Sequence, residues 1–385
     1  MACVVADRFK WYGRLCLLTG CLFVRGLHRN IKNATTSPKS WYSLYASFCI
    51  ITLYVGEFTY IVTGSRSEFN ESRLSTRVFY GFVYGFAQFK VAVNIATSVI
   101  KASELLNFFR AAERYERVTG FQRSRDSFAM SKVFLLVRIT MVAIFCSAAA
   151  MTFSYLADRC NETPSLLLKV YLIIVVVLDL FLYLPHDIVY SSVLRPNCEV
   201  LVAYIRAQCE ELVTVAQRTD PLSRMQNVSR LERIRVDLCA VRNLKVRLER
   251  IWKWPLLMAS VNVLISMSID ISAAFEKAVT SEGIFLSAVF STYQALDFAD
   301  LSMLSQAMVN EATRLKGILK TMATGDCPEC YINQVHFLYD AVQPNDMRLN
   351  CGNFFKLDTP LLVTMAGAII TFTVILVQTV DQSRL

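Results

Sequence analysis

Residues 359–380 read TPLLVTMAGAIITFTVILVQTV, a stretch of 22 residues without a charged side chain. A helix needs about 20 mostly apolar residues to cross a bilayer, because its backbone polar groups must be paired internally. Thr371, Ile375 and Gln378 recur at steps of four and three, so they share one face of such a helix. Thr379 lies beside that face. An uncharged helix with polar side chains at these positions is typical of one that lines a water-filled pore.

The composition of the whole chain points to a membrane protein as well. Hydrophobic residues make up 54% and charged residues 18% of the 385 residues, and the mean hydropathy is +0.40. These values are too apolar for a soluble protein of this length. The sequence therefore predicts an all-α membrane protein with seven transmembrane helices, at Trp41–Thr63, Val78–Ile100, Val133–Ala157, Leu166–Ser191, Pro255–Phe275, Ile284–Leu304 and Thr359–Val380.

Lysine and arginine are distributed unevenly between the predicted loops. Thirty lie in the loops on the side of the amino terminus and six lie in the alternate loops. Because positively charged loops stay in the cytoplasm, we expect a cytoplasmic amino terminus and an extracellular carboxyl terminus. The predicted regions are a cytoplasmic segment (1–40), spans 1–4 (41–191), a cytoplasmic helical loop (192–254), spans 5–6 (255–304), a cytoplasmic loop with an anchor helix (305–358), and span 7 with a short extracellular tail (359–385).

Two segments outside the spans also have a helical pattern. The run Leu15–Val24 is too short to span and has no following cleavage site, so it predicts a short helix in the interface or beside the bundle. In the 192–254 loop, apolar residues recur at steps of three and four and predict an amphipathic helix that leads into Trp252-Lys-Trp254-Pro255. The apolar stripe of this helix needs a partner, either other helices or another subunit, with anionic lipid as the alternative. The stripe consists of Leu231, Ile234, Leu238, Val241, Leu244, Leu248 and Ile251.

Several ionisable residues fall inside the predicted spans, where each costs about 2.5–3.5 kcal/mol near the bilayer centre if it faces lipid. They are Glu57, Lys90, Arg138, Asp179, Asp270 and Asp297. One interpretation is that they pair with one another or with trapped water. The other is that some line a ligand pocket in the outer half of the membrane, where aromatic side chains lie at similar depth. The candidates for that pocket are Glu57, Tyr60, Tyr84, Asp270 and Tyr293.

The sequence offers little for covalent modification, metal binding or a cofactor. Asn70 and Asn161 begin N-glycosylation sequons in predicted extracellular loops. Cys327-Pro-Glu-Cys330 lacks a second matched pair, so free thiols are expected rather than a zinc site. No phosphate-binding glycine loop or ordered catalytic triad is present. We therefore expect no enzyme activity, no catalytic residue, no cofactor and no nucleic-acid partner.

The sequence Thr371-Phe-Thr-Val-Ile-Leu-Val-Gln378 resembles the signature in the last span of insect gustatory receptors, a family of insect chemoreceptors. In that signature a Thr-Tyr pair precedes five apolar residues and Gln-Phe. Here Phe372 replaces the tyrosine, Thr373 takes an apolar position and Thr379 replaces the final phenylalanine. The upstream segment from Cys351 to Asp358 also looks like the approach to that span in the family.

The resemblance implies a subunit of a ligand-gated, non-selective cation channel in the plasma membrane of gustatory receptor neurons. Its ligand would be a small-molecule tastant, and four subunits, identical or related, would assemble within membrane lipid. The seventh helices would surround the pore. Thr371 would line it, and Ile375, Gln378 and Thr379 would form the constriction near its outer end.

Two other kinds of membrane protein are compatible with many spans. A seven-transmembrane G-protein-coupled chemoreceptor is the main alternative, because Asp158-Arg159-Cys160 resembles a D-R-Y motif. The last span, however, has no N-P-x-x-Y, and the reversed orientation would place the thirty positive charges outside. A transporter is disfavoured because we find no internal repeat, and Pro185 interrupts only the fourth span.

Overall fold

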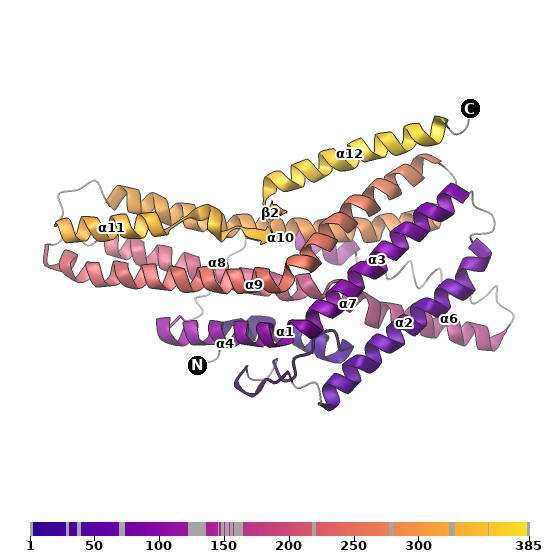
Figure 1. The fold of residues 1–385 in the computed structure, drawn as a ribbon, viewed down its shortest axis with the longest axis horizontal. Coiled ribbons are helices and arrows are strands. Elements are labelled where there is room, and N and C mark those ends of the chain that lie inside the picture. The colour runs from indigo at the N-terminus through magenta and orange to yellow at the C-terminus, as the bar shows by residue number, and fades with distance from the viewer. Residues whose placement is uncertain are drawn as a thin grey trace.

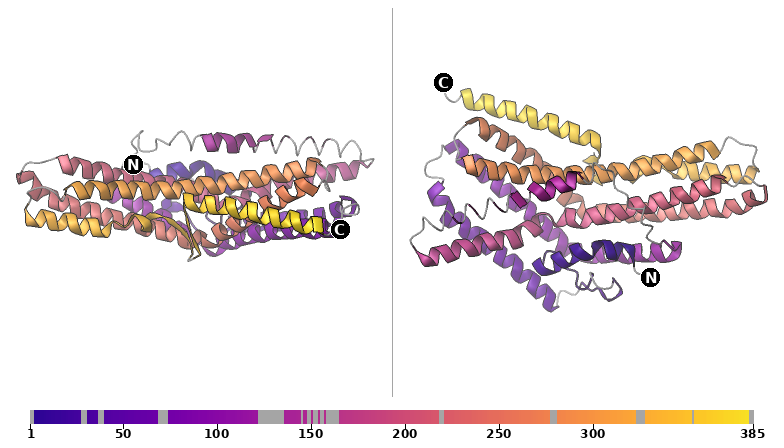
Figure 2. Two further views of the ribbon diagram at one scale, coloured as in Figure 1. Left: turned by 90° about the horizontal axis from the view of Figure 1, so that it is seen from above. Right: turned by 180° about the vertical axis from the view of Figure 1, so that it is seen from behind.

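A computed structural model gives the fold in Figures 1 and 2. It describes residues 3–27, 31–36, 40–68, 74–121, 136–144, 146–147, 150, 154, 157, 165–217, 221–276, 281–322, 328–352 and 354–382. This part of the chain is almost entirely helical. Its α-helices are α1 (Val4–Thr19), α2 (Trp41–Glu68), α3 (Leu74–Ile100), α4 (Ala102–Thr119), α6 (Leu166–Leu178), α7 (Leu184–Asp187), α8 (Val189–Gln217), α9 (Pro221–Glu276), α10 (Ser281–Met322), α11 (Glu329–Ala341) and α12 (Thr359–Gln382). The shorter elements are η1 (Ile31–Asn33), the π-helical turn η3 (Asp179–Tyr183), η4 (Pro344–Met347), β1 (Leu349–Cys351) and β2 (Phe355–Leu357).

The helices form two regions that differ in the side chains they expose. At one end of Figure 1, α8, α10, α11 and the first half of α9 form an elongated bundle, and α1 and α4 lie along it. At the other end α2, α3, α6, α12 and the second half of α9 diverge. Most of the exposed large apolar side chains belong to these diverging helices. An exposed apolar surface on this scale requires an apolar surrounding, as a bilayer provides.

The apolar stripe predicted for the first half of α9 is confirmed. All seven of its side chains, from Leu231 to Ile251, are buried. Their partners are α4, α8, α10 and α11 of the same chain. Of the charged residues on the other positions, Glu232 and Arg235 pair at 2.6 Å along the helix, and Arg242 pairs with Asp346 at 2.5 Å. The stripe is thus covered within the chain, without need of a lipid surface or another subunit.

The fifth predicted span does not begin a new helix at Pro255. α9 runs without interruption from Pro221 to Glu276, so it connects the bundle with the diverging region. Pro255 lies inside it, where the missing N–H and the ring disturb one helical turn. Figure 1 shows α9 changing direction between its two halves. The ring of Trp252 is fully buried among the helices of the protein. The ring of Trp254, two residues later, is 47% exposed.

The fourth predicted span is interrupted, as its proline indicated. α6 ends at Leu178, the π-helical turn η3 follows, and α7 has Pro185 in its first turn. After Ile188 the chain continues as α8. The imidazole Nδ1 of His186 lies 2.7 Å from the carbonyl oxygen of Leu182, so the ring hydrogen-bonds to the backbone of the irregular turn. Such π-helical segments are frequent at functional sites.

The helix near the amino terminus lies earlier than predicted. α1 ends at Thr19, halfway through the run Leu15–Val24, because Gly20 adopts a left-handed conformation (φ 70°). A side chain at Gly20 would also approach the Ala46 backbone to 2.9 Å. The tyrosine hydroxyls of Tyr42 and Tyr45 donate to carbonyls of Leu22 and Leu18. α1 therefore packs beside the bundle, with its end fastened to the first turns of α2.

Two described segments are long and apolar enough to cross a membrane by length and composition. They are 227–272 within α9 and Thr359–Gln378 in α12, while Trp41–Gly56 is apolar but shorter. These segments overlap most of the fifth and seventh predicted spans. The third predicted span is described only in part, with residues 136–144 helical. Seven spans and a cytoplasmic amino terminus accordingly stay predictions.

Trp252 and Trp254 provide a matched test of this packing. Trp252→Ala is expected to lower the free energy of unfolding by about 3–5 kcal/mol, because it leaves a large cavity between α9 and its neighbours. Trp254→Ala, two residues away on the exposed face, should cost under about 1 kcal/mol. Thermal unfolding of the detergent-solubilised protein measures both. Equal losses would contradict the burial of Trp252.

Candidate functional site

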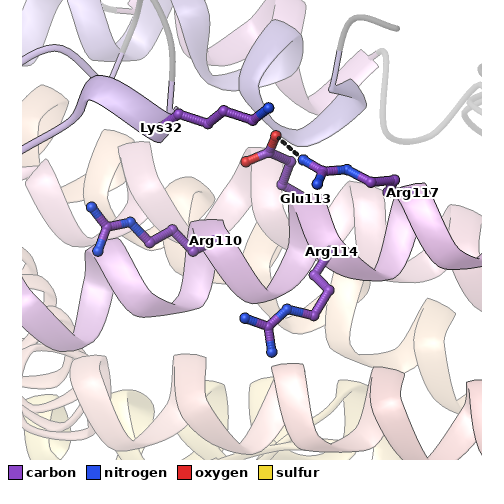
Figure 3. A pocket seen from close by; sticks show the side chains of 5 residues that line it. All are labelled: Lys32, Arg110, Glu113, Arg114 and Arg117. Carbon is purple, nitrogen blue, oxygen red and sulfur yellow. Dashed lines mark hydrogen bonds and ion pairs between the residues drawn. The ribbon is translucent and has the colours of Figure 1, made fainter.

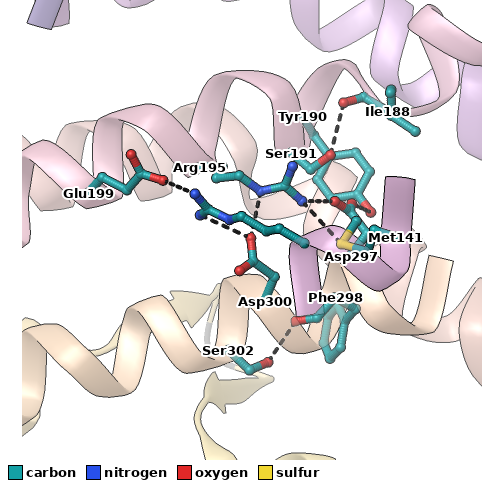
Figure 4. Close-up of polar contacts among 11 residues, drawn as sticks. Met141, Ile188, Tyr190, Ser191, Arg195, Glu199, Asp297, Phe298, Asp300 and Ser302 are labelled. Atoms are coloured by element: carbon teal, nitrogen blue, oxygen red, sulfur yellow. Dashed lines mark hydrogen bonds and ion pairs between the residues drawn. The ribbon is translucent and has the colours of Figure 1, made fainter. Parts of the chain in front are cut away.

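A cluster of ion pairs joins α8 and α10 where the bundle meets the diverging helices (Figure 4). Arg195 of α8 places its Nε 2.6 Å from Oδ2 of Asp300, and its Nη2 pairs with Asp297. The Tyr190 hydroxyl donates to the second oxygen of Asp297 at 3.2 Å. Both aspartates are buried on one face of α10, one helical turn apart. Arg195 therefore pairs with two buried carboxylates at once.

Two further arginines extend this cluster to other helices. Arg138, in the part of the third predicted span that is described, pairs with Glu199 at 2.6 Å and Asp300 at 3.3 Å. Arg8 of α1 reaches the other oxygen of Glu199 at 3.8 Å. We call the six charged residues the arginine cluster: Arg8, Arg138, Arg195, Glu199, Asp297 and Asp300. Its three positive and three negative charges balance, and they connect four helical segments.

A second buried cluster links α3, α7, α9 and α10. Lys90 places its Nζ 2.7 Å from Oδ1 of Asp187, and both side chains are almost fully buried. The Asn94 amide donates to the carbonyl oxygen of Asp187 at 2.8 Å. Gln294 donates to Oδ2 of Asp187 at 3.3 Å, and Asn262 donates to Gln294 at 2.5 Å. We call Lys90, Asn94, Asp187, Asn262 and Gln294 the lysine cluster. The interruption after α6 is what allows α7 to present Asp187 to Lys90.

A β-hairpin fixes the start of α12 to the bundle. Strands β1 and β2 pair antiparallel, with Asn350 opposite Lys356, and Gly352 turns the chain at a φ of 61°. The amide of Asn350 donates to Glu249 of α9 at 2.6 Å. The Asp358 carboxylate accepts from the amide of Leu361 in the first turn of α12 at 2.9 Å. Its other oxygen pairs with Arg348 at 2.7 Å. The hairpin therefore connects α9 directly to the start of α12.

Glu249 has an unusual environment for a carboxylate in that contact. Burial raises its pKa, and Lys245, whose Nζ lies 2.8 Å away, acts in the opposite direction. The Nζ of Lys245 also donates to the carbonyl oxygen of Asp346 at 2.7 Å. A carboxylate whose pKa is higher in the folded than in the unfolded protein lowers the free energy of unfolding when it ionises. The hairpin contact is thus held by a charge that is costly to bury.

α12 contacts its own chain along one face only. Met365 and Thr373 are buried, and α9 and α10 are its partners. Thr371, Ile375 and Gln378 are exposed on other sides, with Ile375 at 50%. The Thr371 hydroxyl donates to the carbonyl of Gly367, one turn earlier in the helix. The side chain of Thr379 is outside the described part of α12. The three described pore candidates therefore share a surface that this chain leaves uncovered.

The five residues predicted for a ligand pocket lie on four helices. Glu57 and Tyr60 belong to α2, but their side chains are outside the described residues. Tyr84 on α3 and Tyr293 on α10 are half-buried, and Asp270 on α9 is buried. Ser287 of α10 donates to one oxygen of Asp270 at 2.6 Å. The other oxygen is buried without a hydrogen bond among the described residues.

Asp270 therefore differs from the other described ionisable residues of the predicted spans. Lys90, Arg138 and Asp297 each have an oppositely charged partner, as one of the two sequence interpretations held. No cationic side chain pairs with Asp270 among the residues that the structure describes. The side chain of Asp179, as well as the sequon residues Asn70 and Asn161, lies outside the described part. Cys330 is described as exposed and Cys351 as buried, whereas Cys327 is outside.

Sequence reasoning missed the partners that complete both clusters. Asp187, Arg195, Glu199 and Asp300 were not assigned any role. The sequence spacing did indicate that two pairs share a helix face, because Arg195 and Glu199 lie four residues apart and Asp297 and Asp300 lie three apart. The spacing did not indicate that these two faces meet, since Arg195 and Asp300 are 105 residues apart in the chain.

Comparisons with known proteins identify relatives of this fold. A family model described as 7tm Chemosensory receptor matches residues 8–383. The olfactory receptor OR5 of the insect Machilis hrabei, solved in complex with eugenol, has a similar fold with a TM-score of 0.63. It is 12% identical, over 97% of this chain and 99% of that one. A second structure of that receptor gives the same TM-score at 14% identity, over 96% and 98% of the two chains. No curated protein matches the sequence.

The arginine cluster predicts a large cost for removing one of its acids. Asp300→Ala is expected to lower the free energy of unfolding by about 3–5 kcal/mol, because Arg138 and Arg195 then lose a shared buried partner. Asp340→Ala removes an exposed aspartate of α11 and should cost under about 1 kcal/mol. Thermal unfolding of the solubilised variants tests the difference. A cost for Asp300→Ala no larger than that of the control would refute the role of the cluster.

Proposed function

Because the chain belongs to the 7tm chemosensory receptor family, we propose that it is a subunit of a ligand-gated, non-selective cation channel that senses a small-molecule tastant. The observation that carries this proposal is α12. Residues 359–380 of this apolar helix carry no charge, and the helix meets its own chain along one face and exposes Thr371 and Gln378. A single helix cannot enclose a pore, so the uncovered polar face calls for further subunits.

In the proposed assembly, four subunits, identical or related, surround a pore in the plasma membrane of gustatory receptor neurons. Each subunit crosses the membrane seven times with its amino terminus in the cytoplasm. The bundle of α8–α11 then extends into the cytoplasm and the α12 helices meet at the axis. Thr371 lines the pore, and Ile375, Gln378 and Thr379 form its outer constriction. A hydroxyl ring from Thr379 dewets less readily than an apolar one, which favours the side chains of Ile375 as the barrier.

The proposed ligand pocket lies in the outer half of the membrane, between α2, α3, α9 and α10. Glu57, Tyr60, Tyr84, Asp270 and Tyr293 are its residues. One buried oxygen of Asp270 has no hydrogen bond among the described residues, and it supports this location because such an oxygen is costly to bury until a donor reaches it. The similar olfactory receptor was solved in complex with eugenol, which supports a small-molecule ligand here.

Coupling between ligand and pore would use contacts that the fold provides. α9 carries Asp270 in its outer half, Asn262 of the lysine cluster in the middle, and Glu249 against the hairpin before α12. A ligand that binds the open arrangement of α9 and α10 more tightly would shift the population toward it. A differential affinity of a few kcal/mol per tetramer is enough for this shift.

Whole-cell recording tests the function. The full chain is expressed with candidate partner subunits and exposed to a panel of tastants while G-protein signalling is blocked. A cation current that persists during the block is the expected result. A current that the block abolishes would instead support a G-protein-coupled receptor.

The pore assignment predicts which face of α12 controls permeation. Gln378→Ala and Ile375→Ala are expected to change ion selectivity or the ligand-evoked current, because both positions face the proposed pore. Val377→Ala removes a half-buried side chain next to Gln378 and should leave selectivity unchanged. Reversal potentials in mixed cation solutions measure this. If both selectivity and ligand-evoked current were unchanged in the two pore variants, the assignment would be wrong.

The pocket assignment predicts a change in ligand affinity for Asp270. Asp270→Asn is expected to raise the ligand concentration for half-maximal current about tenfold or more, because a hydrogen bond to a charged group contributes about 1.5–3 kcal/mol. Ser268→Ala is the control, since the Ser268 hydroxyl bonds only to the carbonyl of Leu264 in its own helix among the described contacts. If the two variants have the same dose–response curve, Asp270 does not contact the ligand.

A further inference from the structure

A basic hollow lies on the surface of α4, away from the clusters described above (Figure 3). It has a volume of about 330 Å³. Five side chains line it, namely Lys32, Arg110, Glu113, Arg114 and Arg117. Four positive charges and one negative charge leave a formal charge of +3. This size is at the lower end of the range of about 300–1,000 Å³ that small-ligand sites occupy.

The hollow is built from two segments that the fold holds together. Arg110, Arg114 and Arg117 recur at steps of four and three on α4, so they share its exposed face. Lys32 comes from η1, which packs on α4 through the buried side chain of Ile31. Two backbone hydrogen bonds between Arg25 and Thr35, at 2.9 and 3.1 Å, close the segment that carries η1. Lys32 is thus positioned by the fold and not by an unattached tail.

Among the described contacts, the arginine charges of the hollow are only partly compensated. Arg117 pairs with Glu113 at 2.9 Å, but the arginine side chain is 64% exposed, so the pair contributes little. Arg110 donates to the backbone carbonyl of Ala34 at 3.2 Å, and no carboxylate of the described residues pairs with it. Arg114 is exposed and pairs with no carboxylate in the part of the chain that the structure describes. Clustered positive charges of this kind repel one another until an anion binds between them.

We propose that this hollow binds a soluble polyphosphate, such as an inositol polyphosphate or a nucleoside triphosphate. Arginine is suited to this task because its planar guanidinium offers paired donors that match phosphate oxygens. Four cationic groups around one hollow match the dense charge of several neighbouring phosphates better than that of a single carboxylate. Nothing in the proposed pore or ligand pocket uses these residues.

The position of the hollow favours a soluble ligand over a lipid headgroup. α4 follows α3 after Lys101 and leads away from the diverging helices (Figure 1). At about 1.5 Å per residue, Arg110 and Arg117 lie about 15 and about 25 Å along the chain beyond Ile100. The headgroup layer on one side of a bilayer is roughly 5–8 Å thick. The preference for a soluble ligand rests on the proposed end of the second span at Ile100. Binding of the polyphosphate does not depend on channel gating.

A binding measurement on the purified full chain tests the inference. Inositol hexakisphosphate is titrated by calorimetry into protein in neutral-lipid nanodiscs. The double variant Arg110→Gln/Arg114→Gln is expected to bind at least about tenfold more weakly, because it loses two charge-assisted contacts. Arg247→Gln/Arg250→Gln removes two exposed arginines of α9 outside the hollow and should bind within about twofold of the natural protein.

A variant with the opposite expected effect excludes poor folding as an explanation. Glu113→Gln removes the acid among the lining residues and releases Arg117, so the affinity should rise several-fold. Absence of binding to the natural protein, or equal losses in the two arginine double variants, would overturn the proposal. Nanodiscs with phosphatidylinositol bisphosphate form the second arm. If the protein binds this lipid but does not bind inositol hexakisphosphate, the proposal that the ligand is soluble is overturned. The measurement needs no tastant or current, so its failure leaves the channel proposal unaffected.

Discussion

The charges buried between helices are the constraint on which the fold depends. An unpaired carboxylate or guanidinium inside a bilayer costs several kcal/mol, and an opposite charge within the protein offsets that cost. Arg195 meets Asp297 and Asp300, and Lys90 meets Asp187. These pairs fix the positions of α3, α7, α8 and α10 relative to one another. Charges that would destabilise a single helix therefore specify how the helices assemble.

The two longest helices, α9 and α10, run through both regions of the protein. α9 and α10 each extend from the bundle into the diverging region, so both helices connect the two regions. α12 by contrast is attached through the hairpin at its start and through one face. A helix held in this way can change its tilt at a lower cost than α9, whose stripe from Leu231 to Ile251 is buried on several neighbours. In the proposed channel, this arrangement suits a pore helix that moves against a firmly packed scaffold.

Sequence patterns anticipated a large part of this architecture. The spacing of apolar residues from Leu231 to Ile251 predicted the buried face of α9, and the uncharged stretch from Thr359 predicted α12 at its observed start. The resemblance in the last span agrees with the family match over residues 8–383. Pro255 was compatible with a first helical turn or with a kink, and α9 continues through it with a change of direction (Figure 1).

By itself, the sequence determined the apolar segments, the faces of the helices and the family, because hydrophobic periodicity and a short motif are local properties of the chain. Only the tertiary structure decided which acid meets which base. Arg138 and Asp300 are 162 residues apart, and no local pattern relates them. The same holds for the free oxygen of Asp270 and for the hollow around Arg114, which exist only when distant segments come together. Ion pairs and cavities depend on the packing of whole helices, and that packing follows from the sum of all contacts.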